Sequence, residues 1–330
     1  YILGVHMEQH IGLICRGINN IYTVEEKGIS YLCRIKGKQL SQVTEEYNPL
    51  AVGDMVSFVP TNAHEGLILD RLPRRNSFQR WNTKGGSNQT VVANMDLIVC
   101  VTSADTPPFR PRFIDRVIAC CQDVDVMIVM NKCDFPLTED EYERFKLYKT
   151  LGYRVLGVSA KTGENIEKLY KELEGKTVAF VGQSGVGKST LINCLLGSDQ
   201  RTSEVCEKYN RGRHTTNHSL LISGPLFTVV DTPGVREIQV PHRDKATLQE
   251  AFIEFARYAK NCEYERCLHQ DEPGCKVKEA VEEDKIHYDR YESYLRMLAS
   301  LDDKAPLWAG KNDRSNSWRT RMDKDESQEY

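Results

Sequence analysis

The sequence predicts a multidomain protein with a small N-terminal β-barrel, a doubly wound α/β domain and a small α-helical domain. Short β-like runs separated by turn residues fill the first part of the chain, and continuous apolar runs alternate with helical ones in the middle. Helical segments then flank a cluster of cysteines and a histidine. A chain of 330 residues with 40% apolar and 28% charged residues is long enough for several such domains.

The β-barrel is predicted over 7–73. Its β-like runs are IGLI, IYTV, YLCRI, MVSFV and LILDRL, and turn signals such as Gly28 separate them. Their number and length fit a five-stranded oligonucleotide-binding barrel, the OB fold. A generic SH3-like barrel fits nearly as well.

Residues 74–90 are polar, basic and rich in Gly, Ser and Asn, so we expect a linker or flexible loop between two domains. The same stretch carries side chains that could bind RNA phosphates or stack on bases, namely Arg74, Arg75, Phe78, Arg80 and Trp81. A solvated linker is an equal alternative.

The α/β domain is predicted over 91–240. Its apolar runs DLIVCVTS, VDVMIVMN, RVLGVSA, TVAFVG and FTVVD are continuous rather than alternating, as strands covered on both faces require. Helices are expected between them, at about 111–122, at about 139–151, in NIEKLYKEL and from Lys188. The result is a doubly wound, mostly parallel sheet.

A phosphate-binding P-loop is the strongest single motif. The pattern GxxxxGK[ST] lies between the strand TVAFV and the helix STLINCLL. Lys188 would contact the β- and γ-phosphates, and the Ser189 hydroxyl would bind Mg²⁺. A glycine-rich turn that binds nothing is disfavoured by the flanking strand and helix. The phosphate-binding candidates are Gly182, Gln183, Ser184, Gly185, Val186, Gly187, Lys188, Ser189 and Thr190.

Two further segments are candidates for reading guanine. Asn131, Lys132, Cys133 and Asp134 resemble the NKxD motif of GTPases, and Ser159, Ala160 and Lys161 resemble their second base-contact motif. The Asp134 carboxylate can accept hydrogen bonds from N1–H and the N2 amine of guanine, whereas adenine has no such donor pair. Asn131 would brace the loop, the Lys132 stem would cover the base, and the Ala160 N–H would meet O6.

The γ-phosphate switches are expected after the P-loop. Asp231, Thr232, Pro233 and Gly234 resemble the DxxG motif, in which Asp231 holds Mg²⁺ through water and the Gly234 N–H senses the γ-phosphate. Within RGRHTT at 211–216, Thr216 is the favoured Mg²⁺ ligand and Thr215 is the fallback. A basic surface loop is the alternative for this segment.

The residue after the DxxG glycine is Val235, where many GTPases have a glutamine that positions the attacking water. An apolar side chain cannot orient water. We therefore expect slow intrinsic hydrolysis, with the missing function supplied by His214 or by a partner.

The motif order is circularly permuted, because the guanine-reading motifs precede the P-loop. Each strand and loop can keep its place in the sheet, so the site can survive. The chain then leaves the domain just past the second switch. We expect a rearrangement of residues 231–236 to pull directly on the helical domain that follows.

The helical domain, predicted over 241–305, contains a candidate zinc site. Helices are expected in ATLQEAFIEFARYAK, VKEAVEEDK and HYDRYESYLRMLASL. Four residues within a short span could bind structural zinc, namely Cys262, Cys267, His269 and Cys275. Free thiols are the alternative, and four protein ligands argue against a catalytic zinc. Residues 306–330 are polar and aperiodic, so we expect a mobile tail.

Net charge and cysteine content indicate which partners and which cellular compartment suit this chain. A formal net charge of −3 argues against a uniformly basic nucleic-acid binder, so any RNA contact needs local patches. An odd 11 cysteines, with no signal-peptide pattern, indicate a reducing cytoplasm. No apolar run of about 18 residues is present, so we expect no membrane contact.

These motifs together resemble the ribosome small-subunit-dependent GTPase A family of bacteria. Further family-like segments are 92–96, 108–109, 114–116 and the RGRHTT switch. The resemblance implies a GTPase that acts in late maturation of the small ribosomal subunit. It also implies that the subunit stimulates hydrolysis, that hydrolysis drives release, and that His214 is catalytic. The implied partners are the small subunit and its rRNA, with no DNA, and the chain is expected to be a monomer.

Two competing functions stay open at this point. The first is a GTP-loaded scaffold for RNA or the ribosome in which hydrolysis is incidental. The second is an ATP-using P-loop enzyme, which Asp134 and Lys161 disfavour because they suit guanine.

Overall fold

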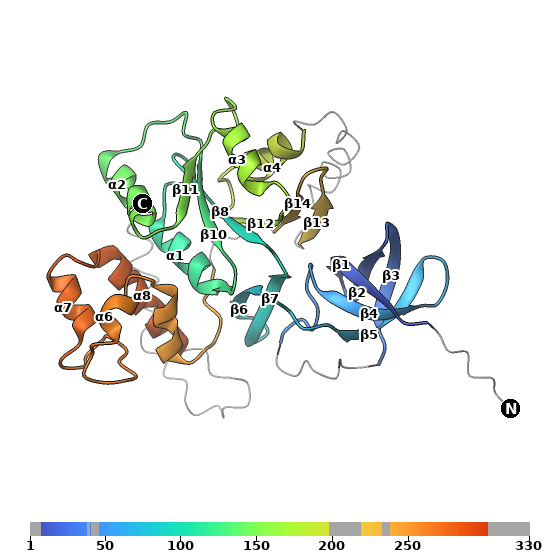
Figure 1. Cartoon of the computed structure of the whole chain (residues 1–330), viewed down its shortest axis with the longest axis horizontal. Coiled ribbons are helices and arrows are strands. Elements are labelled where there is room, and N and C mark those ends of the chain that lie inside the picture. The colour runs from blue at the N-terminus through green and yellow to red at the C-terminus, as the bar shows by residue number, and fades with distance from the viewer. Residues whose placement is uncertain (1–7, 38–39, 41–45, 198–218, 233–237, 303–330) are drawn as a thin grey trace.

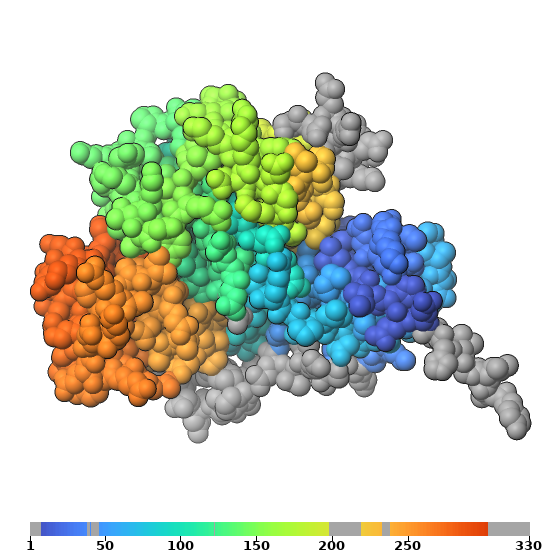
Figure 2. Space-filling model, viewed as in Figure 1, coloured from blue at the N-terminus to red at the C-terminus, as the bar shows by residue number. Residues whose placement is uncertain are grey.

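The computed structural model places the α/β domain between the barrel and the helical domain (Figures 1 and 2). It describes residues 8–37, 40, 46–197, 219–232 and 238–302, and only the backbone of Gln122. The predicted tail therefore lies outside the described residues. Among the helices within these ranges, none is both long and apolar enough to cross a membrane.

The N-terminal barrel is closed. Its strands are β1 (His10–Ile18), β2 (Ile21–Glu26), β3 (Ile29–Ile35), β4 (Met55–Pro60) and β5 (Glu65–Arg71). They pair in the order β1-β2-β3-β5-β4, and pairing of β4 with β1 completes the circle. Alternate residues, including Ile14, Val24 and Phe58, fill the interior with no exposed surface. This five-stranded barrel fits the predicted OB fold.

Residues 74–90 are not the flexible linker that their composition suggested. Together with their neighbours they form strands β6 (Ser77–Asn82) and β7 (Ser87–Ala93), which pair as the β6–β7 hairpin. The short strand β9 (Cys121–Gln122) extends this sheet on the β6 side. The polar composition was misleading because polar side chains bond to each other across the hairpin, as Arg80 does to Gln89. The predicted domain boundaries themselves stay predictions.

The α/β domain has the predicted doubly wound sheet. Its strands are β8 (Leu97–Ser103), β10 (Val126–Asn131), β11 (Arg154–Gly157), β12 (Thr177–Gly182), β13 (Leu220–Ser223) and β14 (Thr228–Asp231). Five of them run parallel in the order β11-β10-β8-β12-β14, and β13 adds antiparallel to β14. The carboxyl ends of the parallel strands therefore meet at one edge, where a ligand site is expected.

Helices cover both faces of this sheet (Figure 1). They are α1 (Pro111–Cys120), α2 (Glu139–Thr150), α3 (Ile166–Leu173) and α4 (Lys188–Gly197). Ile98 and Cys100 of β8 pack with the cluster that includes α1, whereas Val99 and Val101 pack with the cluster that includes α3 and α4. Successive residues of a buried strand thus serve two cores, which explains the continuous apolar runs.

The barrel and the sheet are joined through their backbones. Strand β13 pairs with β1 at Leu220 and Arg16, so the barrel continues the sheet. At Gly53, with φ +91°, an added Cβ would lie 2.0 Å from the carbonyl oxygen of Ala93. Only glycine allows the barrel to approach the α/β domain this closely.

The helical domain begins differently from the prediction. Residues 246–260 form a 3₁₀ helix, η2 (Lys245–Ala251), and a short helix, α6 (Ala256–Ala259), instead of one α-helix. The tighter turns bring Phe252 and Phe255 together against Tyr294. The other two predicted helices are present as α7 (Lys276–Glu282) and α8 (Tyr288–Asp302).

A buried ion pair fixes the helical domain to the α/β domain. Arg290 of α8 donates to Asp115 of α1, and both residues are 2% exposed. The guanidinium also bonds to Glu254 at 2.7 and 3.1 Å, and the Tyr148 hydroxyl donates to Asp115 at 2.7 Å. Removing one partner from such a network typically costs about 3–5 kcal/mol.

Candidate functional site

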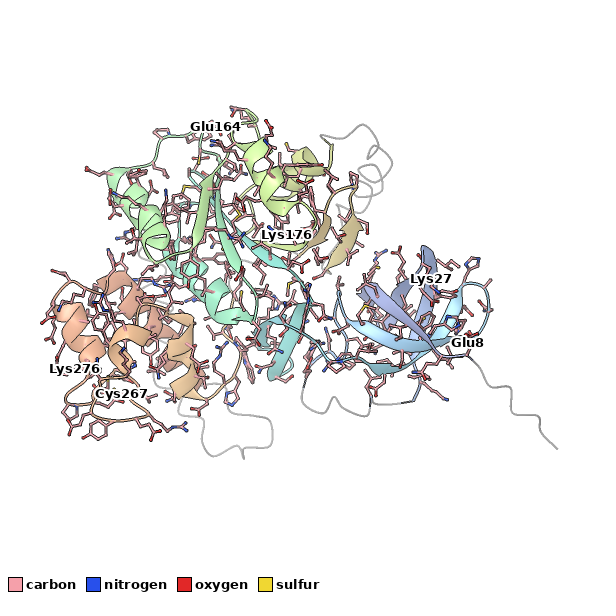
Figure 3. The ribbon with its side chains drawn as sticks, in the orientation of Figure 1. Glu8, Lys27, Glu164, Lys176, Cys267 and Lys276 are labelled. Atoms are coloured by element: carbon pink, nitrogen blue, oxygen red, sulfur yellow. The ribbon has the colours of Figure 1, made fainter. Side chains whose placement is uncertain are left out.

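The predicted P-loop lies at the carboxyl edge of the sheet, between β12 and α4. Figure 3 labels Glu164 at this edge, in the loop after β11, and Lys176 just before β12 at the opposite edge. Gly185 and Gly187 have φ values of +89° and +84°. A Cβ on Gly187 would also lie 2.4 Å from the Asn131 amide nitrogen. Both positions therefore require glycine.

Lys188 is paired inside the site. Its Nζ lies 2.8 Å from Oδ1 of Asp231, and only 6% of the lysine side chain is exposed. A buried ammonium needs a counter-charge, and here the carboxylate predicted to hold Mg²⁺ provides it. This contact brings the P-loop and the start of the DxxG motif together, so a bound phosphate would compete with Asp231 for Lys188.

Asn131 connects three of the predicted motifs. Its amide nitrogen donates to the carbonyl oxygen of Val186 in the P-loop at 2.9 Å. Its amide oxygen accepts from the N–H of Ala160 at 3.1 Å. The side chain is buried, with 2% of the residue exposed. The predicted bracing role of Asn131 thus has a specific geometry, in which one amide joins the phosphate loop to both guanine-reading loops.

Asp134 is held by the second base-contact motif. Ser159 Oγ donates to Asp134 Oδ1 at 2.7 Å, and Lys161 Nζ lies 3.9 Å from Oδ2. The hydrogen bond from Ser159, with a smaller contribution from Lys161, lowers the pKa of Asp134 below its ordinary value. The lowered pKa favours the ionised carboxylate, which is the form that the predicted contact with two guanine N–H groups requires.

The loop after β8 is a part of the site that the motifs did not indicate. Lys132 donates to the carbonyl oxygen of Thr106, and Pro107 lies beside Gly185, 3.3 Å from the position of an added Cβ. Strand β8 is central in the sheet, so its carboxyl end faces the same edge as the P-loop. This position, rather than any motif, could have indicated the loop.

Much of the switch region lies outside the described residues. Thr232 is described, and its hydroxyl donates to the carbonyl oxygen of Phe180 at 2.6 Å. His214, Thr215, Thr216, Gly234 and Val235 all belong to the ranges that are not described. Their predicted roles stay predictions.

The segment after the second switch is bound to the β6–β7 hairpin. The N–H of Trp81 donates to the carbonyl oxygen of Gln239 at 2.9 Å. The Asn88 side chain makes two hydrogen bonds with the His242 backbone, at 2.7 and 2.9 Å. The chain after the second switch is therefore attached to the hairpin before it enters the helical domain, and the expected pull on that domain stays a prediction.

The basic stretch predicted for RNA contact is used largely inside the protein. Arg74 bonds to Asp54 and Glu46, and Phe78 is 2% exposed in the core. Arg75, on the surface, pairs with Asp96 at 2.6 Å. These three residues therefore do not form a solvated linker, while RNA contact by Arg80 and Trp81 stays a prediction.

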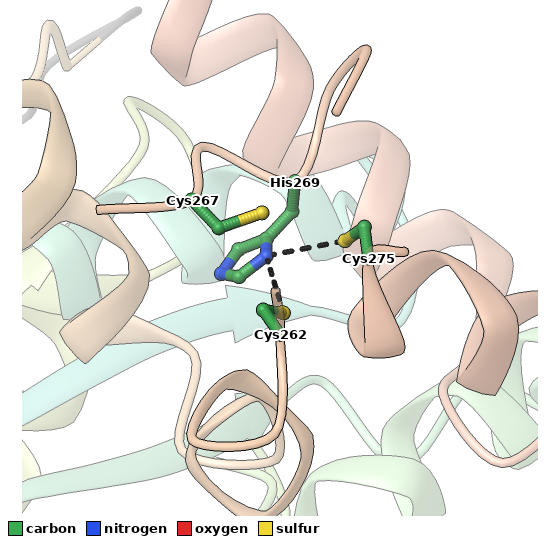
Figure 4. Close-up of side chains that lie close together, drawn as sticks. All are labelled: Cys262, Cys267, His269 and Cys275. Carbon is green, nitrogen blue, oxygen red and sulfur yellow. Dashed lines mark hydrogen bonds between the residues drawn. The ribbon is translucent and has the colours of Figure 1, made fainter. Parts of the chain in front are cut away.

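The four candidate zinc ligands converge (Figure 4). The sulfur atoms of Cys262, Cys267 and Cys275 and a ring nitrogen of His269 all lie within 4.8 Å of one another. His269 Nδ1 is 3.3 Å from Cys275 Sγ and 3.7 Å from Cys262 Sγ. Tetrahedral zinc with Zn–S distances of about 2.3 Å requires separations of about 3.5–4 Å, so the cluster fits this ion.

Gln249 of η2 orients the histidine, and the sequence motifs did not indicate it. Its Oε1 lies 2.8 Å from His269 Nε2, which leaves Nδ1 facing the thiols. Burial lowers the pKa of His269, and this favours the neutral imidazole that binds metals. Tyr291 and Tyr294 support the same loop through hydrogen bonds to the carbonyl oxygens of His269 and Leu268.

Comparisons with known proteins agree with this geometry. The family model "RsgA GTPase" matches residues 71–241, and "RsgA N-terminal domain" matches residues 11–68. The small ribosomal subunit biogenesis GTPase RsgA of Borreliella burgdorferi is 38% identical over 290 residues, which cover 86% of this chain and 94% of that protein.

Two solved structures resemble the whole chain. YjeQ from Thermotoga maritima has a TM-score of 0.66 and 30% identity, covering 89% of this chain and 99% of its own. YloQ, described as a circularly permuted GTPase, has a TM-score of 0.64 at 23% identity, covering 93% and 100%. The second likeness supports the permuted fold that the motif order predicted.

Proposed function

Because the chain belongs to the RsgA GTPase family and is a GTP-hydrolysing enzyme, we propose that it acts in maturation of the small ribosomal subunit. In this proposal it acts late in assembly, in the cytoplasm and as a monomer. Its partners are the subunit and its rRNA; the subunit stimulates hydrolysis of GTP to GDP and phosphate, and hydrolysis drives release. The names of its relatives support the subunit as partner.

The contact network of Asn131 is the single observation that carries the GTP-binding part of the proposal. One buried amide joins the P-loop to both loops predicted to read guanine, so phosphate and base recognition belong to one site. Residues 131–134, 159–161, 182–190 and Gly234 bind GTP in this proposal. The paired Asp134 carboxylate selects guanine because adenine would leave its oxygens without donors.

Lys188 stabilises charge on the phosphates during hydrolysis. On GTP binding its ammonium exchanges Asp231 for phosphate oxygens, which frees that carboxylate to act as a metal ligand. Ser189, Thr216 and Asp231 are the proposed Mg²⁺ ligands, and the ion would supply further neutralisation of phosphate charge. His214 is the proposed catalytic residue, because Val235 cannot position water.

Zinc is proposed as a structural ion in the helical domain. Cys262, Cys267, His269 and Cys275 supply four ligand atoms and leave no open position for substrate. The ion would link the loop after α6 to the start of α7, which are short elements with little core of their own.

Measuring GTP turnover with and without purified small subunits tests the proposed function. We expect slow turnover alone and a large increase with subunits, which should decline as salt rises because phosphate contacts weaken. The His214→Ala variant should lose the increase while keeping nucleotide affinity. ATP in place of GTP is the matched control and should give neither binding nor turnover.

Release is tested separately by sedimentation of the protein with subunits. The protein should sediment with subunits in the presence of a non-hydrolysable GTP analogue and should dissociate after hydrolysis of GTP. Equal turnover with and without subunits would contradict stimulation and favour a scaffold in which hydrolysis is incidental. Wild-type turnover by His214→Ala would remove that residue from the mechanism.

A further inference from the structure

A cavity of about 590 Å³ lies where the barrel, the β6–β7 hairpin and the α/β sheet meet. We call it the Arg80 cavity. The turn between β1 and β2, with Asn19 and Asn20, forms one wall, and Arg80 forms another. Thr232, which follows the proposed Mg²⁺ ligand Asp231, belongs to the lining as well. The volume lies within the usual range for small-molecule sites.

The lining of this cavity has an unusual charge composition. Among the lining residues that the structure describes, Arg80 is the one charged side chain, and no aspartate, glutamate or lysine accompanies it. The other polar side chains of the lining are neutral: amides from Asn19, Asn20, Asn48 and Gln89, and hydroxyls from Tyr22, Tyr47, Thr90, Ser219 and Thr232. The guanidinium brings the one charge among these residues, and the amide N–H groups and hydroxyls can add hydrogen-bond donors, so the cavity is suited to an anion.

Arg80 differs from its neighbour Arg74 in how its charge is compensated. Arg74 makes hydrogen bonds of 2.7–3.0 Å to the carboxylates of Asp54 and Glu46. The hydrogen bonds of Arg80 within the described chain go to one neutral oxygen, Gln89 Oε1, at 3.2 and 3.3 Å. Burial lowers the pKa of Arg80, because removal from water disfavours the charged guanidinium.

We propose that the Arg80 cavity binds a phosphate group, held by the Arg80 guanidinium and by the amide side chains of the cavity wall. A guanidinium matches phosphate because two parallel N–H groups can meet two oxygens. Tyr47, which is 48% exposed, also lines the cavity, so there is an aromatic surface for a base attached to that phosphate. The phosphate comes from an RNA backbone or from a free nucleotide, and the first source rests on the proposed function.

Phosphate titration of nucleotide-saturated protein tests the proposal. The P-loop is first filled with Mg²⁺ and a non-hydrolysable GTP analogue, and inorganic phosphate is then titrated at constant ionic strength by calorimetry. We expect one phosphate per chain in the wild type and affinity about tenfold weaker or worse in Arg80→Gln, because a charged donor is lost. Arg80→Lys should retain part of the affinity.

Arg75→Gln is the matched control, because Arg75 lies in the same segment but is exposed and paired with Asp96. It should bind phosphate as the wild type does. Absence of phosphate binding by the saturated wild type, or equal affinity in Arg80→Gln, would overturn the proposal.

Thermal melting without phosphate distinguishes a ligand-binding arginine from a structural one. Arg80→Gln should melt at or above the wild-type temperature, because it removes a half-buried charge that bonds to no carboxylate among the described residues. Arg74→Gln should melt well below it, because two carboxylates would lose their partner. A large loss of stability in Arg80→Gln would mean that the arginine is structural and would overturn the assignment.

Binding to a short single-stranded oligoribonucleotide and to purified small subunits identifies the source of the phosphate. For an RNA source, Arg80→Gln should weaken both and reduce the slope of log affinity against log salt by about one. For a free-nucleotide source, Arg80→Gln should bind the oligoribonucleotide and the subunits with wild-type affinity but should lose phosphate binding. That result would still support the phosphate site. If the wild type does not bind subunits, the proposed function fails while the phosphate titration still decides this inference.

Discussion

The nucleotide site and the Cys/His cluster both hold buried polar groups, but they satisfy them in different ways. At the nucleotide site the protein provides the partners, since Lys188 pairs with Asp231 and Asn131 bonds to two backbone groups. In the cluster, three thiols face a single imidazole nitrogen. Ionised thiolates there would repel one another, so they need a cation between them.

This difference separates two kinds of site. The nucleotide site is assembled by folding, and its ligand replaces contacts that already exist. The cluster supplies ligand atoms whose mutual attraction is weak, so a zinc ion bound there, as we propose, would contribute to folding itself. We therefore expect the largest effect from removal of the ion, a smaller effect from a change in the contact with the base, and the smallest effect from loss of a single hydrogen bond.

Removal of zinc should have the largest effect. Chelation, or the variant His269→Ala, should abolish cooperative unfolding of the helical domain, because structural zinc contributes about 10–16 kcal/mol to the folding of small zinc-dependent peptides. Guanine-nucleotide affinity should change little, since the nucleotide site is assembled without the ion. Metal analysis should give one zinc per chain in the wild type and in the control Cys194→Ala, whose thiol is outside the cluster.

If chelation abolished GTP binding as completely as it unfolds the helical domain, the proposed difference between the two sites would be wrong. Such a result would mean that the nucleotide site needs a folded helical domain. The Arg290–Asp115 contact, which joins the two domains, would then be the connection to test. Calorimetric melting, followed alongside binding of a fluorescent guanine nucleotide, separates these outcomes.

The change Asp134→Asn should have the second-largest effect. An amide cannot accept from both N1–H and N2–H₂ of guanine, so GTP affinity should fall about 10⁴-fold. The asparagine can donate to the C2 carbonyl of xanthine, so xanthosine triphosphate should now bind. Competition binding of the two nucleotides measures this exchange. Asp140→Asn, the same chemical change at an exposed position on α2, should bind GTP like the wild type.

The strands, most helices and the motif positions could be predicted because each depends on neighbouring residues. The P-loop requires a strand, glycines and a helix in sequence, and φ values above +80° at Gly185 and Gly187 agree with that requirement. The spacing of three cysteines and His269 likewise identified the cluster before the fold was known. Circular permutation leaves local patterns of this kind intact, because each pattern lies within one continuous segment and only the order of the segments changes.

The features that could not be predicted depend on residues far apart in the chain. The β6–β7 hairpin appeared as a linker because its polar side chains bond to each other, and because its other stabilising contacts are with residues 239–242 and with Glu46 beside the barrel. Residues 246–260 adopt tighter turns because Phe252, Phe255 and Gln249 must reach Tyr294 and His269. Their sequence alone has an ordinary helical period, so the tertiary contacts decided the conformation.

A pH profile of nucleotide binding should give the smallest effect and the finest test of the assembled site. The hydrogen bond from Ser159 is the largest cause of the lowered pKa of Asp134. A lowered pKa means that binding is intact above the ordinary range of aspartate and is lost only as the pH falls through the lowered value. Ser159→Ala should therefore move this acid limb to higher pH, while affinity at neutral pH falls modestly because Asp134 stays ionised there.

Lys161→Met is the matched variant, because Lys161 makes a smaller contribution to the same pKa from 3.9 Å away. It should move the acid limb in the same direction by a smaller amount. The affinity of a fluorescent guanine nucleotide, measured between about pH 2.5 and 7 with circular dichroism as a folding control, reports both shifts, because the acid limb lies below the ordinary pKa of aspartate. If Lys161→Met moved the limb further than Ser159→Ala, the charge of the lysine would govern Asp134. The nucleotide site would then depend on an exposed, salt-screened pair rather than on the internal hydrogen bond that distinguishes it from the cluster.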